Sequence, residues 1–223
     1  MKRRPEPELM DQPAQARAYA EADFSEPHDA FVTQFRERFP GHQPRRVLDL
    51  GCGPADISCR FAQAYPDCRV LGIDGAAAML ALGEQRLQQA RLQHRVSLQL
   101  HHLPAPDLAT QGPFDTIICN SLLHHLLDPL TLWQTIRQAA AADCAVLIMD
   151  LRRPDSERQA AALVRLHAGD EAELLQHDFY HSLLAAYRPQ EVAVQIRHSG
   201  LQLAVHPITD RHMIMVGFVR PSP

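Results

Sequence analysis

The stretch that decides the fold is RVLDLGCGPAD, residues 46–56. Strand-forming residues lead directly into two glycines, Gly51 and Gly53, and an apolar helical segment follows. Glycines at such a turn let a ligand approach bare backbone at the N-terminus of the helix. The stretch therefore predicts a strand that turns sharply into a helix at a ligand-binding site.

Two acidic side chains of this stretch favour one class of ligand over another. The dinucleotide fingerprint G-x-G-x-x-G requires a third glycine at position 56, where this chain has Asp56. Asp49, two residues before the first glycine, puts a carboxylate at the strand end. A carboxylate repels a pyrophosphate but suits a cationic amino-acid ligand. These residues argue against NAD and favour S-adenosylmethionine (SAM), which carries a sulfonium and an α-ammonium group and no phosphate.

The segment Asp49-Leu50-Gly51-Cys52-Gly53-Pro54-Ala55 resembles the first motif of the class I SAM-dependent methyltransferases, [E/D]-x-G-x-G-x-[G/A]. The resemblance covers about residues 15–220, with this motif and the NSLLHHL stretch (120–126) as its firmest parts. Segments 15–31, 150–154 and 178–192 are similar to a bacterial subgroup of these enzymes. The resemblance implies in-line transfer of the SAM methyl group to a small molecule, with S-adenosyl-L-homocysteine (SAH) as the product.

Apolar runs of five to seven residues alternate with helical patterns in the first two thirds of the chain. The predicted strands are 46–50, 69–74, 96–101, 114–120 and 145–150, and the clearest predicted helices are 76–92 and 128–141. This alternation predicts a doubly wound α/β fold with a mostly parallel sheet. Two further strands, at 201–206 and 213–219, follow a helix at 189–199 and match the seven-stranded methyltransferase sheet, whose last strand is antiparallel.

A chain of 223 residues fits one domain with a substantial core. Residues 1–14 are polar and proline-rich, and we expect them to form a flexible N-terminus. Residues 15–223 are expected to form a single SAM-dependent methyltransferase domain. Within it we expect an N-terminal helical cap at 15–40 and a helical insertion at 151–188 that serves as a substrate lid.

Composition excludes several classes of function. The net charge of −4 at pH 7 provides no basic surface for a nucleic-acid substrate and suits a small neutral or cationic substrate or a protein partner. No run of about 18 apolar residues predicts a membrane span, and the start lacks the apolar stretch of a signal peptide. The five cysteines form no C-x-x-C pair and are typical of buried thiols in a reducing compartment. We expect a cytoplasmic protein and leave its oligomeric state open.

Further cofactor contacts are expected along the strand ends. Asp74 ends the second strand, where a carboxylate can accept both ribose hydroxyls, and it can also cap the next helix. His102 stands where the family often has an acid that reaches the adenine amino group. An N-terminal helix with a tyrosine closes over the cofactor in the family, which implies Tyr19 here. The expected cofactor-binding residues are Tyr19, Asp49, Gly51, Cys52, Gly53, Asp74, Gly75, Met79, His102, Leu103 and Asn120.

Two histidines follow the fourth strand, where the segment should face the reacting centre. His124 and His125 come shortly after Asn120, and ligands of doubly wound sheets lie beyond the carboxyl ends of the strands. An imidazole with an ordinary pKa near 6.5 suits proton removal at neutral pH. We therefore expect at least one of the pair to be catalytic. In the alternative interpretation, one packs and the other caps.

The same segment argues against a metal. Related O-methyltransferases that act on small RNA ends and on quinone precursors have E-x-x-E-H here, whereas this chain has Ser121-x-x-His124-His125. Without carboxylates a hard cation such as Mg²⁺ lacks its preferred ligands, so no metal is expected. A zinc site would need ligands from elsewhere, such as Asp150, His177, Asp178 or His181.

Two residues are candidates for substrate contacts. Arg152 follows the fifth strand and could bind a substrate carboxylate, or it could be a solvated surface residue. Tyr180 lies in the expected lid, where it could touch substrate or only pack. The acceptor atom (O, N, S or C) stays open. A SAM-binding protein of the same fold without methyl transfer, either a lyase or cyclase that uses the sulfonium charge or a regulator, is the alternative.

Overall fold

A computed structural model describes residues 1–5 and 10–220 of the chain. Its centre is a seven-stranded sheet with the order β3-β2-β1-β4-β5-β7-β6. The strands are β1 (Arg46–Leu50), β2 (Arg69–Asp74), β3 (Val96–Leu100), β4 (Phe114–Asn120), β5 (Ala140–Leu151), β6 (Ala204–Pro207) and β7 (His212–Val219). Strands β1 to β5 are parallel, and β7 runs antiparallel to both β5 and β6. The predicted doubly wound sheet with an antiparallel last strand is confirmed.

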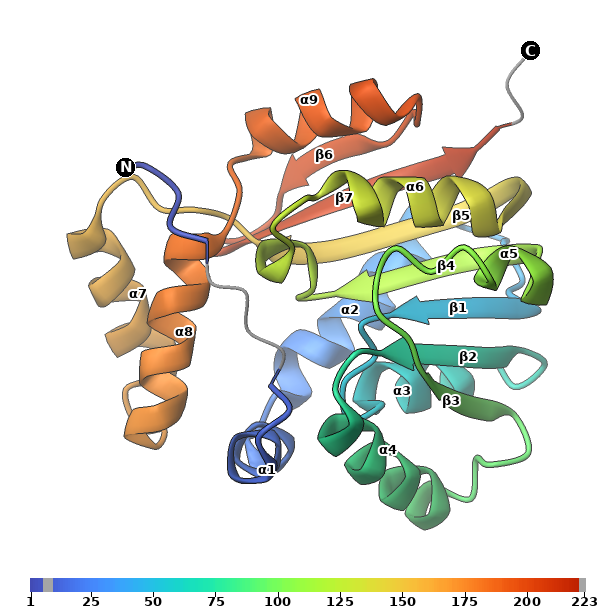
Figure 1. Ribbon diagram of the computed structural model, residues 1–223, viewed down its shortest axis with the longest axis horizontal. Coiled ribbons are helices and arrows are strands. Elements are labelled where there is room, and N and C mark those ends of the chain that lie inside the picture. Colours follow the sequence, from blue (N-terminus) through green and yellow to red (C-terminus); the bar gives the residue numbers. More distant parts are fainter. Residues whose placement is uncertain (6–9, 221–223) are drawn as a thin grey trace.

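Helices cover both faces of the sheet (Figure 1). The helices are α1 (Pro13–Glu21), α2 (Ser25–Arg38), α3 (Asp56–Ala64), α4 (Ala77–Ala90), α5 (Leu108–Gln111), α6 (Leu130–Ala139), α7 (Glu157–Ala168), α8 (Glu173–Ala185) and α9 (Pro189–Ser199). One core cluster joins the sheet to α6 and α9 around Trp133, and another joins it to α2 and α3 around Phe35 and Phe61. Strand residues alternate between these clusters: Val47 belongs to the second and Leu48 to the first.

Several elements differ from their predicted bounds. The helical stretch expected from residue 15 to 39 is two helices, because the chain breaks at residues 22–24 and Asp23 accepts a hydrogen bond from the Ser25 amide at 2.9 Å. Strand β5 begins five residues earlier than predicted, and the short helix α5 was not predicted. No helix within residues 1–5 and 10–220 is long and apolar enough to cross a membrane.

The predicted insertion consists of helices α7 and α8, which stand beyond the end of the sheet where the parallel strands finish (Figure 1). Residues 1–5, expected to be flexible, are held against this region. Arg3 donates hydrogen bonds to the carbonyls of His124 (2.9 Å) and Ala185 (2.6 Å), and its guanidinium lies 3.9 Å from the ring centroid of Tyr187. The first residues thereby connect α8 to the 3₁₀ turn η1 (Leu123–His125). The polar composition of residues 1–5 did not predict that they would lie against α8 and the turn that contains His124.

Candidate active site

A cavity of about 560 Å³ lies at the carboxyl ends of β1, β2, β4 and β5. Its wall combines the glycine turn, the start of β7, helices α1 and α2 and the insertion α7–α8. A second cavity of about 530 Å³ lies at the opposite edge, at Arg46, Arg69 and Val96, where β1, β2 and β3 begin. Ligands of doubly wound sheets bind beyond the carboxyl ends, and none of the predicted site residues lines the second cavity. We therefore take the first cavity as the candidate active site.

The glycine turn forms one wall of this cavity. Gly51 has φ +70° and Gly53 has φ +50°, in the left-handed region that favours glycine. A Cβ atom added to Gly51 would lie 3.0 Å from the Leu122 side chain, whereas one added to Gly53 would meet nothing within 4 Å. Gly51 therefore permits close packing of the β1 and β4 ends. Gly53 is the glycine that leaves open space for a ligand.

Asp74 links the end of β2 to the glycine turn. Its carboxylate accepts hydrogen bonds from the backbone amides of Gly53 and Ala76, both at 2.8 Å. Burial raises the pKa of the carboxyl group, and these backbone bonds oppose the rise. Ala76 is the residue before α4, so this bond orders the turn that leads into the helix, and α4 has no side-chain cap of the kind expected of Asp74. Asp74 also lines the cavity, and a carboxylate has further lone pairs for ligand hydroxyls.

Asp49 lies beneath the turn and does not line the cavity, in contrast to the predicted cofactor contact. Its side chain is on the face of β1 toward α3, where the Ser58 hydroxyl donates a hydrogen bond to it at 2.5 Å. Burial raises its pKa to about 7, although the Ser58 bond acts in the opposite direction. The reason is the alternation of side chains along a strand, which directs position 49 away from the cavity.

The other predicted cofactor residues divide into two groups. Those that line the cavity are Tyr19, Gly51, Gly53, Asp74, Gly75, Met79 and Asn120, and those that do not are Asp49, Cys52, His102 and Leu103. The Asn120 side-chain oxygen is buried and has no hydrogen-bond partner among the described residues. The Tyr19 ring lies 4.8 Å from the Phe24 ring, and burial raises its pKa to about 12. A neutral tyrosine thus covers a cavity that contains an unsatisfied acceptor.

His124 and Asp150 form a buried pair at the cavity. The Nδ1 atom of His124 lies 2.7 Å from Asp150 Oδ1, and the same carboxylate accepts the backbone amides of Leu123 and Leu151, each at 2.7 Å. Both side chains are nearly inaccessible to solvent, with exposed fractions of 3% and 1%. The His125 ring centroid lies 4.0 Å from that of His124. Both predicted histidines line the cavity, and Asp150 orients one of them.

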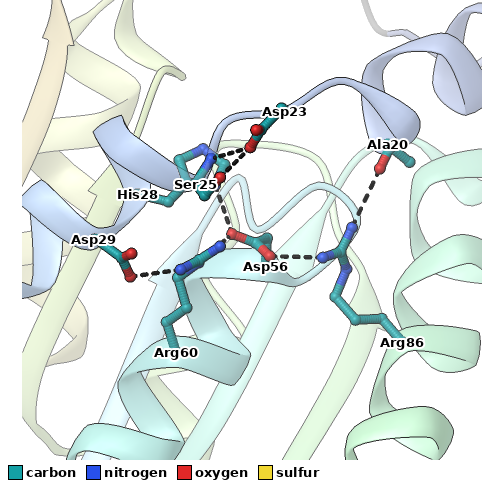
Figure 2. A network of polar contacts seen from close by, with 8 residues as sticks. All are labelled: Ala20, Asp23, Ser25, His28, Asp29, Asp56, Arg60 and Arg86. Carbon is teal, nitrogen blue, oxygen red and sulfur yellow. Dashed lines mark hydrogen bonds and ion pairs between the residues drawn. The ribbon is translucent and has the colours of Figure 1, made fainter.

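Asp56 is the centre of a polar network that fixes the N-terminal helices over the glycine turn (Figure 2). Its carboxylate contacts His28 Nδ1 at 2.6 Å, Arg60 Nε at 2.7 Å and Arg86 Nη1 at 2.6 Å. Arg86 also donates to the Ala20 carbonyl at the end of α1. Burial raises the pKa of Asp56, but the bonds from His28 and Arg60 outweigh it and lower the pKa to about 2. Asp56, which stands where a dinucleotide-binding motif would have its third glycine, therefore connects α1, α2, α3 and α4.

The residues around the glycine turn fit SAM. Gly53 leaves space for a ligand, the unsatisfied Asn120 oxygen can accept from an ammonium group, and Asp74 can accept from hydroxyls. No lysine or arginine lies among the described residues that line this part of the cavity, so a phosphate would find no cation there. A volume of about 560 Å³ is within the usual range of roughly 300–1,000 Å³ for small-ligand sites. Within the described part of the chain, no group of three His, Cys, Asp or Glu residues could hold a metal ion.

Neither predicted substrate residue lines the cavity. The Arg152 guanidinium donates to the Asp210 carbonyl at 3.2 Å, and the Tyr180 hydroxyl donates to Glu157 at 3.4 Å. The arginine that does line the cavity is Arg211, at the start of β7. The sequence offered one signal for Asp150, an acid at the end of a buried strand like Asp74. It offered none for Arg211, whose place depends on antiparallel pairing.

Comparisons with known proteins agree on the class of fold and domain. Residues 48–146 match a family model described as a methyltransferase domain. A ubiquinone biosynthesis O-methyltransferase of Acinetobacter baumannii is 28% identical over 186 residues, which are 80% of this chain and 75% of that protein. A trans-aconitate 2-methyltransferase of Variovorax paradoxus is 30% identical over 196 residues, with 80% and 68% covered. The structure of an O-methyltransferase family protein from Burkholderia thailandensis superposes with a TM-score of 0.69 at 17% identity. The match covers 93% of this chain and 60% of that one.

Proposed function

The chain belongs to the class I SAM-dependent methyltransferases, and on that premise we propose that it methylates an oxygen atom of a small molecule with His124 as general base. The observation that carries this proposal is the shared cavity. Gly53 and Asp74 line it on one side, and the His124–Asp150 pair lies at the next strand ends. A cofactor site and a positioned base thus open into one space.

Bound SAM would supply an electrophilic methyl group on its sulfonium. We infer that Asp74 accepts the ribose hydroxyls, that the Asn120 oxygen accepts from the α-ammonium group, and that Gly53 leaves room for the methionine part. The cap at residues 15–40 would cover the cofactor through Tyr19, and the insertion at 151–188 would cover the substrate. Both segments would thus belong to a single methyltransferase domain, the first acting on the cofactor and the second on the substrate.

The His124–Asp150 pair has the arrangement of a general base. With Nδ1–H donated to Asp150, the Nε2 atom of His124 is left to accept a proton from a ligand in the cavity. In the proposed step, Nε2 takes the proton of a substrate hydroxyl as its oxygen attacks the methyl carbon and the carbon–sulfur bond breaks. The Asp150 carboxylate stabilises the imidazolium that forms, and the proton then passes to water.

Oxygen is the acceptor that this site favours. A hydroxyl group retains its proton at neutral pH and needs a base, which an already deprotonated acceptor does not. The A. baumannii relative is named an O-methyltransferase, which supports the same acceptor atom. Most of the rate acceleration would come from positioning the oxygen against the methyl group.

The test measures methyl transfer from methyl-labelled SAM to a panel of phenols and hydroxy acids, with SAH affinity measured by calorimetry. For His124→Gln and Asp150→Asn we expect kcat to fall by about 10²-fold or more while SAH affinity stays within about twofold. The fall in the wild-type rate at acidic pH should disappear in His124→Gln. His198→Gln, on the exposed face of α9, is the matched control and should retain full activity.

Three outcomes would count against the proposal. Normal turnover and an unchanged pH profile in both variants would remove His124 as the base and leave an acceptor that needs none. SAH binding without label transfer to any compound of the panel would favour the alternative of a SAM-binding protein without this activity. Absence of SAH binding in the wild type would overturn the cofactor assignment itself.

A further inference from the structure

Arg211 occupies the part of the cavity farthest from the glycine turn along the sheet. It directly precedes β7, whose first residue, His212, pairs with Leu151 at the end of β5. The Arg152 amide donates to the Arg211 carbonyl at 2.8 Å, which fixes the backbone at this point. Antiparallel pairing therefore brings the start of β7 to the same edge as the ends of β4 and β5. Among the described residues that line the cavity, Arg211 is the only lysine or arginine.

The guanidinium of Arg211 makes no side-chain hydrogen bond within the described part of the chain. Its nearest acid is Asp210, with Nη1 and Oδ1 4.0 Å apart, and the other oxygen of that carboxylate already contacts His167 Nε2 at 2.7 Å. Glu26 of α2 also lines the cavity, yet it forms no ion pair with Arg211 within 4 Å. The Arg211 side chain is only 19% exposed. The guanidinium therefore presents donors to the cavity that no acceptor among the described residues takes up.

Other partly buried arginines of the chain show the contrast. Arg86 donates to Asp56 at 2.6 Å, Arg95 donates to the Ala62 carbonyl at 2.6 Å, and Arg153 donates to Glu191 at 2.5 Å. Each of these side chains has a structural partner that accounts for its place. Arg211 differs because its guanidinium faces the cavity and has no protein acceptor among the described residues, so its donors are available to an anionic ligand there, with which they would form charge-assisted hydrogen bonds.

We propose that Arg211 binds a carboxylate of the methyl acceptor, so that the substrate of this enzyme is a small organic acid. The planar guanidinium can donate two parallel hydrogen bonds to a carboxylate. Glu26 and Asp210 lie near this single cation and would repel a phosphate dianion more strongly than a singly charged carboxylate. This inference rests on the proposed function, because it assigns a binding site to the carboxylate of the same substrate whose hydroxyl His124 would deprotonate.

The order of the strands gives the substrate its approximate length. In sheet order, the lining of the cavity comprises Asp74 at β2, the glycine turn after β1, the His124 turn after β4, Met149 and Leu151 at β5, and Arg211 at β7. Neighbouring strands lie about 4.8 Å apart, so β4 and β7 are separated by roughly 10 Å. The acid would therefore carry its carboxylate within about 10 Å of the hydroxyl that receives the methyl group.

The test is calorimetric titration of the full chain, saturated with SAH, using matched acids and amides: benzoate against benzamide, and hexanoate against hexanamide. In the wild type we expect each acid to bind at least about tenfold more tightly than its amide. Arg211→Gln should lose this preference, with amide affinity within about twofold, and Arg211→Lys should keep part of it. Arg152→Gln, a neighbouring arginine outside the cavity, should keep the full preference.

The inference is overturned if neither acid binds the wild type, if acid and amide bind equally, or if Arg211→Gln retains the preference. Unchanged SAH affinity in each variant excludes misfolding as the cause of a lost preference. Failure of the proposed function would give a different result: the wild type would not bind SAH or would not transfer the methyl group. The acid preference is measured without turnover, so the two outcomes are separable.

Discussion

At the scale of single residues, the two glycines of the turn have different tasks that substitution can separate. Gly53→Ala should weaken SAH binding by about tenfold or more, because its Cβ would enter the open space of the cavity. The free energy of unfolding of this variant should fall by about 1–2 kcal/mol, the cost of an alanine in the left-handed conformation. Gly51→Ala should be clearly less stable, because it adds a contact at 3.0 Å with Leu122 to a similar backbone strain.

Thermal unfolding and SAH calorimetry on both variants check this difference. Ala55 is the internal reference, because it already adopts φ +59° in the same turn without being glycine. Wild-type SAH affinity in Gly53→Ala would show that the cofactor does not lie against this wall. Equal unfolding temperatures of the two variants would contradict the role given to the Leu122 contact.

The sequence predicted cavity residues that follow directly from the end of the strand on which they lie. It did not predict residues that reach the cavity only through pairing with another strand. Gly53, Asp74 and Asn120 follow from position in a strand–turn–helix unit, and they line the cavity. Arg211 comes to the cavity through the register of β7 against β5, which no local pattern encodes. Arg152 was expected to bind a substrate carboxylate; it follows β5 but does not line the cavity, whereas Arg211, paired beside it, does.

At the scale of elements, Asp56 is expected to control how firmly α1 and α2 cover the candidate active site. Asp56→Asn removes the charge that His28, Arg60 and Arg86 share (Figure 2). We expect faster hydrogen exchange in residues 13–38 and SAH affinity lower by roughly tenfold, since charge-assisted bonds contribute about 1.5–3 kcal/mol. The fold should persist, because Phe31 and Phe35 anchor α2 in the core.

The matched control is Asp29→Asn, which removes only the exposed outer contact to Arg60. An exposed pair contributes about 1 kcal/mol or less, so this variant should bind SAH like the wild type. Unchanged exchange in residues 13–38 of Asp56→Asn would show that apolar packing alone holds these helices. Equal effects of the two substitutions would show that the outer contact, not Asp56, is decisive.

Element types were more predictable than element bounds. The helix at Pro189–Ser199 matches the expected range because a proline begins it and Gly200, at φ +77°, ends it. The stretch from 15 to 39 lacks such strong signals, and its break at residues 22–24 is stabilised by the local Asp23–Ser25 contact. Weak stop signals leave the division of a long helical pattern to tertiary contacts.

At the scale of the whole molecule, the strand–helix alternation predicted the topology because parallel strands with short connections admit few arrangements. Contacts between distant segments were not predictable in this way. Residues 1–5 lie against α8 and the His124 turn, and only the folded chain brings these segments together. Stability of the whole chain also depends on titratable groups, and the effects of two of them, Asp49 and His212, oppose each other.

Asp49 has its pKa raised by burial to about 7, so the folded state keeps a proton that the unfolded state releases above about 4. Its contribution to stability therefore falls as pH rises from about 4 to 7. His212 has its pKa lowered to about 4 by burial and by the Arg211 charge, so the unfolded state binds a proton that the folded state does not. Its contribution falls as pH decreases from about 6.5 to 4. Between pH 4 and 6.5 the two slopes have opposite signs and should largely cancel.

Single substitutions should expose each slope in thermal unfolding measured from pH 4 to 8. Asp49→Asn keeps an acceptor for Ser58 and should gain stability over the wild type progressively between pH 4 and 7, with a constant difference above pH 7. His212→Gln should gain over the wild type as pH falls from 6.5 to 4. Asp143→Asn, at an exposed site with φ +57° that asparagine tolerates, should differ from the wild type by the same amount at every pH. A pH-independent difference for Asp49→Asn would mean that the buried carboxyl group is ionised in the folded protein throughout this range. The Ser58 hydroxyl, which donates to this carboxylate, would then have to stabilise its charge.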